Sequence, residues 1–192
     1  MKLLEITQQP NHFLTDPTEI KNWLDLMKIM NYSIQPNGVV DVRGDVKIYQ
    51  QDLTSIPVQF GHVTGDFYCD LNNLTSLAGA PSSVDGSFYC YNNKLTSLAG
   101  APSSVGGNFY CYINHLTSLH NIHKIIKSTR EFICDDYKIN SHILGLLLIK
   151  NLKRVDGIKD VELIINKYLP LGDIHLCQEE LIQAGFPEYA KL

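Results

Sequence analysis

The chain contains 192 residues, of which 44% are hydrophobic and 19% are charged, so it can bury a sizeable core. Its formal net charge of −4, and the scarcity of basic residues between Val46 and Leu119, where only Lys47 and Lys94 occur, argue against a nucleic-acid partner. No apolar run is long enough to cross a bilayer, the N-terminus lacks a signal-peptide pattern, and the five cysteines are an odd number for a disulfide framework. We therefore expect a cytoplasmic protein without membrane contacts.

Residues 1–45 are expected to form a helix followed by a hairpin. The segment Asp16–Glu19 marks a helix start, with a capping aspartate, a proline at the first helical position and a glutamate that completes a capping box. Apolar residues then recur at three- and four-residue steps as far as Met30, which predicts one buried helix face. Two apolar segments next flank Asn37-Gly38, a signal for a hairpin turn. Together they would cap the first unit of the repeat array that follows.

The central stretch, residues 46–139, repeats with a period of 21 residues. Its pattern fits the leucine-rich-repeat form LxxLxLxxNxL, which predicts a short solenoid of about five parallel strands within a mixed α/β fold. The outer two units are degenerate, because Gln51 and Tyr137 stand where the other units have asparagine. The repeated columns are Phe67, Phe88 and Phe109; Cys69, Cys90 and Cys111; Leu74, Leu95 and Leu116; and Leu77, Leu98 and Leu119.

Each column has a physical interpretation. Side chains alternate along a strand, so the phenylalanines and cysteines should point inward and their neighbours outward. The asparagine column (Asn72, Asn93 and Asn114) can satisfy backbone groups of adjacent coils. The glycine column (Gly65, Gly86 and Gly107) requires either positive φ or a close backbone approach. The segments 80–83 and 101–104 are too short and too rich in proline and serine for a helix, so we expect extended, polyproline-like or 3₁₀ structure there.

The repeat pattern fails after Leu119, where an insertion over residues 121–127 is expected to hold a helical turn. Residues 140–192 are expected to form a C-terminal helical cap, with helices over 141–149, 159–168 and 173–184.

The chain resembles a family of predicted leucine-rich-repeat proteins of bacteriophages. The resemblance is carried by the lead-in Gly38–Val46, by the Asn-Lys-Leu-Thr-Ser-Leu-Ala-Gly-Ala-Pro unit, and by the tail Cys177–Gly185. It implies a phage or phage-derived origin and a short solenoid, and carries no activity onto named residues. The repeats are also similar to those of short-repeat effectors of Gram-negative bacteria. Some of those effectors bear a ubiquitin-ligase domain much larger than this tail, so this second resemblance implies fold only.

The outward strand positions form the candidate binding site. In a repeat array the strand face is concave, and a partner reads its outward columns together. Six of the ten tyrosines fall on this face, and tyrosine is enriched at interfaces because it buries a large area with few rotatable bonds. The alternative is that neighbouring rings stack on one another for stability alone. The expected partner-binding residues are Tyr49, Tyr68, Asp70, Tyr89, Tyr91, Tyr110 and Tyr112.

Other candidate sites are weaker. Cys134, beside Asp135 and Asp136, suggests a nucleophile but shares the phase of the inward cysteines, where a buried thiol is inert. His115, His120 and His123, with His62 at a different phase, could approach one another around the insertion, and His120 and His123 are three residues apart, as a helical metal pair can be. Without a third ligand at a fitting spacing, they are better explained as polar loop residues. The basic cluster of Lys124, Lys127 and Arg130 is typical of a solvated turn or an acidic-partner contact. Common nucleotide-binding, hydrolase and metalloprotease motifs are absent. We therefore expect no cofactor, no metal and no enzymatic activity.

These observations predict a non-enzymatic protein-binding module that uses the tyrosine-rich strand face, with a host protein as partner if the chain is phage-borne. The alternative is a structural or virion-associated component that packs on itself or on other phage proteins.

Overall fold

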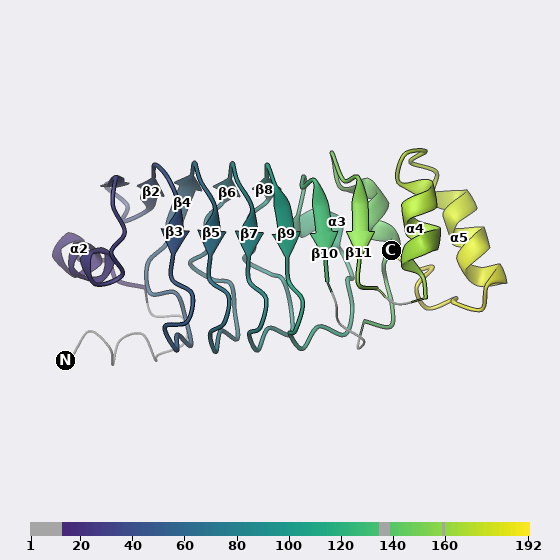
Figure 1. The fold of residues 1–192 in the computed structure, drawn as a ribbon, viewed down its shortest axis with the longest axis horizontal. Coiled ribbons are helices and arrows are strands. Elements are labelled where there is room, and N and C mark those ends of the chain that lie inside the picture. The colour runs from purple at the N-terminus through teal and green to yellow at the C-terminus, as the bar shows by residue number, and fades with distance from the viewer. Residues whose placement is uncertain (1–12, 135–138, 159) are drawn as a thin grey trace.

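The computed structural model describes residues 13–134, 139–158 and 160–192. These residues form a mixed α/β fold in which a parallel β-solenoid of about five coils is stacked along the long axis of the molecule (Figure 1). Helix α2 lies at one end of the stack, and helices α4 and α5 lie at the other. The earlier coils contribute one short strand to each of two sheets, whereas the last two contribute a strand to one sheet and only an isolated bridge, at Ser128 and Lys150, to the other side.

The first sheet contains six parallel strands, which follow one another at 21 residues in the first three steps and at 23 residues in the last two. In spatial order they are β3 (Val46–Lys47), β5 (Phe67–Tyr68), β7 (Phe88–Tyr89), β9 (Asn108–Tyr110), β10 (Glu131–Ile133) and β11 (Arg154–Asp156). Phe67, Phe88 and Phe109 are register partners across neighbouring strands, as the repeat predicts. The five expected strands are confirmed. Strand β11 is an addition that extends the sheet beyond the boundary expected at residue 139, whereas Tyr137 lies outside the described residues.

The second sheet covers the opposite side of the coils. It contains β1 (Tyr32–Ile34), β2 (Val40–Val42), β4 (Phe60–Val63), β6 (Ser83–Val84) and β8 (Ser104–Val105), all parallel except β1. Of the extended, polyproline-like and 3₁₀ forms expected here, the extended one is present. The pairing of β6 and β8 with their neighbours was not predicted; it arises because the coils are also close enough to bond on this side, where the backbone N–H of Ser103 donates to the carbonyl of Ser82 (3.0 Å).

The core lies between the two sheets. Phe67, Phe88, Phe109 and Phe132 are fully buried and follow one another at ring-centroid distances of 5.2–5.6 Å. The aligned cysteines are equally buried and form no disulfide, and burial raises the pKa of the Cys69 and Cys90 thiols well above the usual range. The prediction that the cysteines are packing residues is confirmed. The aligned cysteines are Cys69, Cys90, Cys111 and Cys134.

A column of buried asparagines joins each coil to the one before it. The side-chain oxygen of Asn93 accepts a hydrogen bond from the backbone N–H of Leu74 (2.9 Å). Its amide nitrogen donates to the carbonyl oxygens of Cys69 (3.0 Å) and Cys90 (3.1 Å). The predicted role of this column, to satisfy backbone groups of adjacent coils, is therefore confirmed. Corresponding bonds are made by Asn72 and Asn114.

The glycine column marks the corner between the two sheets, where successive coils approach each other closely. None of the three has positive φ. A Cβ atom at Gly86 would lie 2.8 Å from the carbonyl carbon of Gly65, and one at Gly107 would lie 3.0 Å from that of Gly86. Of the two explanations left open by the sequence, close backbone approach is the one that applies.

The N-terminal helix and hairpin form as expected. Helix α2 spans Pro17–Leu26, and a carboxylate oxygen of Asp16 accepts hydrogen bonds from the first free N–H groups of the helix, including that of Thr18 (2.8 Å). Strands β1 and β2 pair antiparallel across a turn in which Gly38 has a φ of 82°. Trp23 lies on the buried face of α2, with its ring centroid 6.3 Å from that of Phe60 in the second sheet.

Helix α2 ends four residues before the expected position. Lys28 adopts a left-handed φ of 56°, and the N–H of the buried Ile29 bonds back to the carbonyl of Leu24 (2.9 Å). This turn closes the helix and directs the chain toward β1. Met30 is 70% exposed, so its apolar side chain fits the helical spacing without joining the core.

The predicted C-terminal helices are present, with one exception. The insertion contains the single turn α3 (Ile122–Ile125), and two helices follow, α4 (Glu162–Tyr168) and α5 (Ile174–Gln183). The helix expected over 141–149 is instead a five-residue 3₁₀ helix, η1 (Leu144–Leu148). It starts late because His142 has a left-handed φ of 63° and donates its backbone N–H to the carbonyl of Glu188 (3.1 Å), and it ends before Lys150, which bridges Ser128 in the preceding coil.

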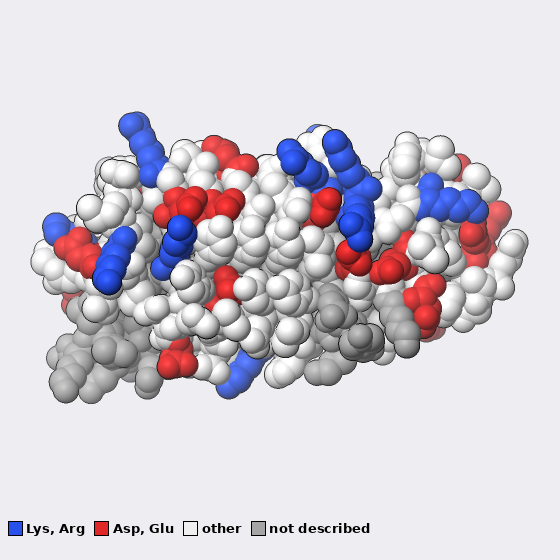
Figure 2. All heavy atoms as spheres, in the orientation of Figure 1, with Lys and Arg blue, Asp and Glu red and all other residues white. Residues whose placement is uncertain are grey.

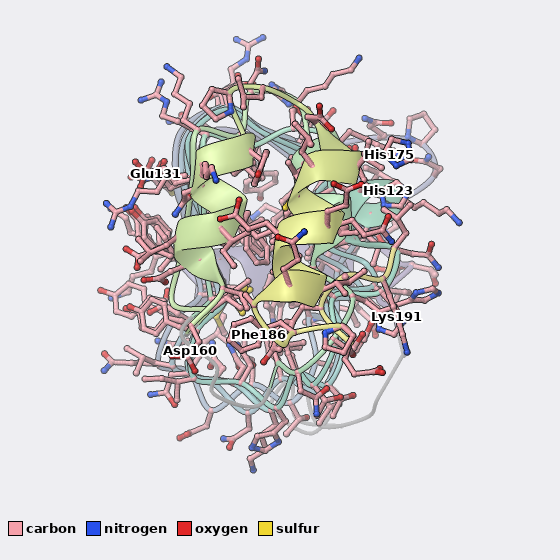
Figure 3. The ribbon with its side chains drawn as sticks, turned by 90° about the vertical axis from the view of Figure 1, so that its right-hand side faces the viewer. His123, Glu131, Asp160, His175, Phe186 and Lys191 are labelled. Atoms are coloured by element: carbon pink, nitrogen blue, oxygen red, sulfur yellow. The ribbon has the colours of Figure 1, made fainter. Side chains whose placement is uncertain are left out.

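Helix α4 covers the last strand of the first sheet. The side-chain oxygen of Asn166 accepts a hydrogen bond from the backbone N–H of Val155 (2.7 Å), and its amide nitrogen donates to the carbonyl of the same residue (2.7 Å). One side chain thus satisfies both backbone groups that β11 directs away from the sheet. Figure 3, an end-on view, shows α4 and α5 side by side across this end of the stack.

Candidate functional site

The seven predicted partner-binding residues share one surface, the outward side of β3, β5, β7 and β9 with the residues that follow these strands. We call this surface the tyrosine face. It consists of Tyr49, Tyr68, Asp70, Tyr89, Tyr91, Tyr110 and Tyr112.

Five of the six rings form two parallel stacks. Tyr68, Tyr89 and Tyr110 follow one another at centroid distances of 4.5 and 4.7 Å, with an interplanar angle of 6° at both steps. Tyr91 and Tyr112 form the second stack, at 4.5 Å and 8°. The ring planes therefore contact each other, and what remains for a partner is the ring edges and the hydroxyl groups.

Tyr49 stands at the edge of these stacks. It meets Tyr68 edge to face, with the centroids 6.4 Å apart, and it is 41% exposed. The ammonium group of Lys47 lies 5.8 Å from the centroid of the Tyr68 ring and forms an ion pair with Asp45. The tyrosine face thus ends at β3 in a mixed aromatic and charged border.

The environment of the tyrosine face raises the pKa of several of its hydroxyl groups. Burial, followed by a hydrogen bond to Asp66 (2.8 Å), raises the pKa of the Tyr68 hydroxyl. Burial likewise raises the pKa of the Tyr89 and Tyr112 hydroxyls. At the other end of the first stack, the amide nitrogen of Asn108 donates to the Tyr110 hydroxyl oxygen (3.0 Å). At neutral pH the hydroxyl groups of Tyr68, Tyr89 and Tyr112 are therefore neutral.

Asp70 differs from the expectation, because its side chain is only 3% exposed. It interrupts the second column between Tyr49 and Tyr91, where a tyrosine would continue the stack. Burial raises the pKa of its carboxyl, an effect that the Tyr91 hydroxyl partly opposes. The carboxylate oxygen Oδ1 has no hydrogen-bond partner in the described part of the chain. Asp70 is thus a buried polar group at the centre of the face and not an exposed contact.

The surface above the stacks carries little charge. Figure 2 shows few charged side chains over β7 and β9, whereas acidic side chains gather above β3 and β5 and basic ones above β10 and β11. An uncharged aromatic surface with a charged border resembles the core and rim of a protein interface.

The cysteine and histidine candidates from the sequence form no site among the described residues. Cys134 is fully buried, Asp135 and Asp136 lie outside the described residues, and burial raises the pKa of the Cys177 thiol to about 11. The ring of His120 packs against that of His142, with the centroids 4.9 Å apart. Across the described ranges, no group of three or more histidine, cysteine or acidic side chains is placed to hold a metal ion.

The second sheet brings together three residues that the sequence analysis did not connect. His62 contacts the Ser83 hydroxyl through Nδ1 (2.8 Å) and the Asp85 carboxylate through Nε2 (3.2 Å). These residue types occur in serine hydrolases, but there the acid that orients the histidine is buried. Here the side chains of His62 and Asp85 are 44% and 60% exposed. The three side chains form a hydrogen-bonded row across adjacent coils on an exposed surface. Their proximity could be recognised only once the register of the coils was known.

The fold and the tyrosine face define a class of protein: a parallel β-solenoid with an aromatic surface on one sheet. Comparison with protein-family models, curated proteins and solved structures finds no match to the chain. In the portion that the structure describes, no helix is long and apolar enough to span a membrane.

Proposed function

We propose that the chain is a non-enzymatic protein-binding module whose partner docks on the tyrosine face. The observation that carries the proposal is the pair of tyrosine stacks on a surface with little charge. Stacking fixes the rings before a partner arrives, so little side-chain entropy remains to be lost on binding. The rows extend across four strands, or on the order of 15 Å, which suits a loop or a peptide segment.

We further assign the coils to the leucine-rich-repeat type and the terminal helices to the role of caps. The inward phenylalanines and the asparagine column support this assignment, while the strands of the second sheet are a departure from the expected outer side. The resemblance to phage proteins leads us to propose a host protein as the partner.

The test compares three double variants in affinity capture from a host lysate, followed by direct titration of the captured protein. Tyr89→Ala with Tyr110→Ala should reduce capture at least tenfold, because it removes two rings from the first stack. Tyr89→Phe with Tyr110→Phe keeps the stack and reports on the hydroxyl groups alone. Lys94→Ala with Thr96→Ala, at exposed turn positions, is the matched control and should bind like the wild type.

Thermal unfolding of the same variants separates binding from stability. If the alanine pair lowers the melting temperature strongly and capture is unchanged, the stacks serve stability alone and the proposal is wrong.

A second candidate function is self-association through the same face. The stacking of the rings on one another favours it, since aromatic surfaces of two copies can pack in a similar manner. Light scattering at several concentrations tests this candidate. A rise in mass with concentration that the alanine pair abolishes would support a structural component, and a constant monomeric mass would contradict it.

A further inference from the structure

A basic patch lies at the corner between the two sheets, in the last two coils. It consists of Lys127, Arg130, Lys150 and Lys153, all exposed. The backbone N–H of Lys150 donates to the carbonyl of Lys127 (2.9 Å), and that of Lys153 donates to the carbonyl of Arg130 (2.8 Å). These bonds place Lys150 beside Lys127 and Lys153 beside Arg130 in adjacent coils, so the four cationic residues form two neighbouring columns of two. Figure 2 shows basic side chains gathered above β10 and β11.

The patch carries charge that its surroundings do not balance. Like charges in adjacent strand positions destabilise a sheet. Within the described residues no acidic side chain forms an ion pair with any of the four, although nearby Arg154 pairs with Asp156 (2.6 Å). In the column of Arg130 and Lys153 the preceding coils have uncharged glycines, ending with Gly107, whose carbonyl accepts from the N–H of Arg130 (2.9 Å). In the column of Lys127 and Lys150 the two preceding coils have serines, ending with Ser103, whose carbonyl accepts from the N–H of Lys127 (2.7 Å). The replacement of uncharged residues by paired cations, in a chain with a net charge of −4, indicates that these cations have a role other than stabilising the fold.

The patch borders a cavity of about 350 Å³. Arg130 and Lys153 line it, together with the hydroxyl-bearing residues Ser104 and Ser128. The two serine oxygens lie 3.0 Å apart, so one hydroxyl hydrogen is used between them and the other can be donated to a ligand. Cationic and hydroxyl donors without a carboxylate at the cavity wall form an environment for an oxyanion.

We propose that this cavity and the basic patch bind a ligand through a phosphate group. Arg130 supplies a planar guanidinium that can bond two phosphate oxygens at once, and Lys153 supplies a point charge from the next coil. The Ser104 and Ser128 hydroxyls supply neutral donors. Phosphate is favoured over an acidic protein segment because the cavity lining offers no exposed apolar side chain, whereas protein interfaces combine charge with an apolar core. The site is separate from the tyrosine face.

Isothermal titration of the full chain with inorganic pyrophosphate at low ionic strength tests the proposal. Arg130→Gln with Lys153→Gln should weaken binding at least tenfold. The matched control, Lys28→Gln with Lys94→Gln, makes the same change in net charge at exposed positions away from the patch and should leave the affinity within twofold of the wild type. Thermal unfolding should show that both double variants remain folded, with the patch variant as stable as the wild type or more so.

Absence of pyrophosphate binding by the wild type, or equal weakening in both double variants, would overturn the proposal. A second arm with a short DNA duplex distinguishes the source of the phosphate. Binding of both probes, lost together in the patch variant, would indicate a nucleic-acid backbone, with an affinity that falls steeply with salt. Binding of pyrophosphate alone would indicate a small phosphorylated ligand. Binding of poly-glutamate alone would contradict the proposal and indicate an acidic protein.

Discussion

At the scale of single residues, Asn93 joins two coils with one side chain. Its amide group bonds to the backbone on both sides of a coil boundary, and the residue is buried. The neighbouring asparagines bond to the same carbonyl groups: that of Cys90 also accepts from Asn114 (3.0 Å), and that of Cys69 also accepts from Asn72 (3.1 Å).

Asn93→Ala should lower the free energy of unfolding by about 2–3 kcal/mol. The main cost is the buried N–H of Leu74, which would lose its hydrogen-bond partner, since both carbonyls keep another donor. Denaturant unfolding measures the change. Lys94→Ala, at the exposed next position, is the control and should stay within about 0.5 kcal/mol of the wild type. Equal stability of both variants would mean that the column is not structural.

Asp70 should make stability fall as the pH rises. Because burial raises its folded-state pKa above the usual 3.8, the native state holds this proton more tightly than the unfolded state does. The contribution is fully favourable below pH 3.8 and is lost as the pH rises through the folded pKa. Asp70→Asn removes this dependence, so the stability of the wild type relative to the variant should decrease between pH 3 and pH 7.

Chemical unfolding over this range measures the difference, and the comparison with the variant cancels the opposite contributions of Asp41 and Asp45, whose carboxyl pKa values are lowered by backbone hydrogen bonds. A constant difference across the range would contradict a raised pKa.

At the scale of elements, the repeated turn after each strand of the first sheet imposes one backbone conformation on different residues. Gln50, Leu71, Asn92 and Ile113 all have φ between 51° and 54°. Asparagine tolerates this left-handed region, whereas a β-branched side chain is strained there. The geometry of the coil therefore prevails over the preference of the residue at Ile113.

Ile113→Asn should raise the free energy of unfolding by about 1 kcal/mol, since it relieves this strain. Little apolar burial is lost, because Ile113 is 56% exposed. The reciprocal variant Asn92→Ile should lower stability by a similar amount. Thermal unfolding checks both, and a lower melting temperature for Ile113→Asn would show that the turn is unstrained.

Five strands of the first sheet could be predicted because each follows the repeat pattern, whereas β11 and the short strands β6 and β8 of the second sheet could not. Ser83-Val84 and Ser104-Val105 are too short to show a period, and they become strands only through the coil beside them. Arg154–Asp156 lacks the phenylalanine and cysteine of the repeat, and pairs with β10 because the preceding coil places it there. The local sequence pattern thus identifies the strands that share the repeat. The other strands form only because they pair with a neighbouring coil.

At the scale of the whole molecule, the two proposed sites depend on register to different degrees. The tyrosine face could be predicted from the period alone. The burial of Asp70 could not, because it depends on the orientation of the neighbouring tyrosine rings. The basic patch was visible in sequence only as Lys124, Lys127 and Arg130. The alignment of Lys150 and Lys153 with the latter two follows a 23-residue step that differs from the main period. A net charge of −4 conceals this local excess.

Asn166 sets a limit on how far this solenoid can grow. A bare final strand would act as a template on which the strand of another molecule could assemble. By occupying both free backbone groups of Val155, the side chain ends that template within the same chain. A longer protein of this kind could gain coils by insertion within the array, while strands added after β11 would first have to displace helix α4.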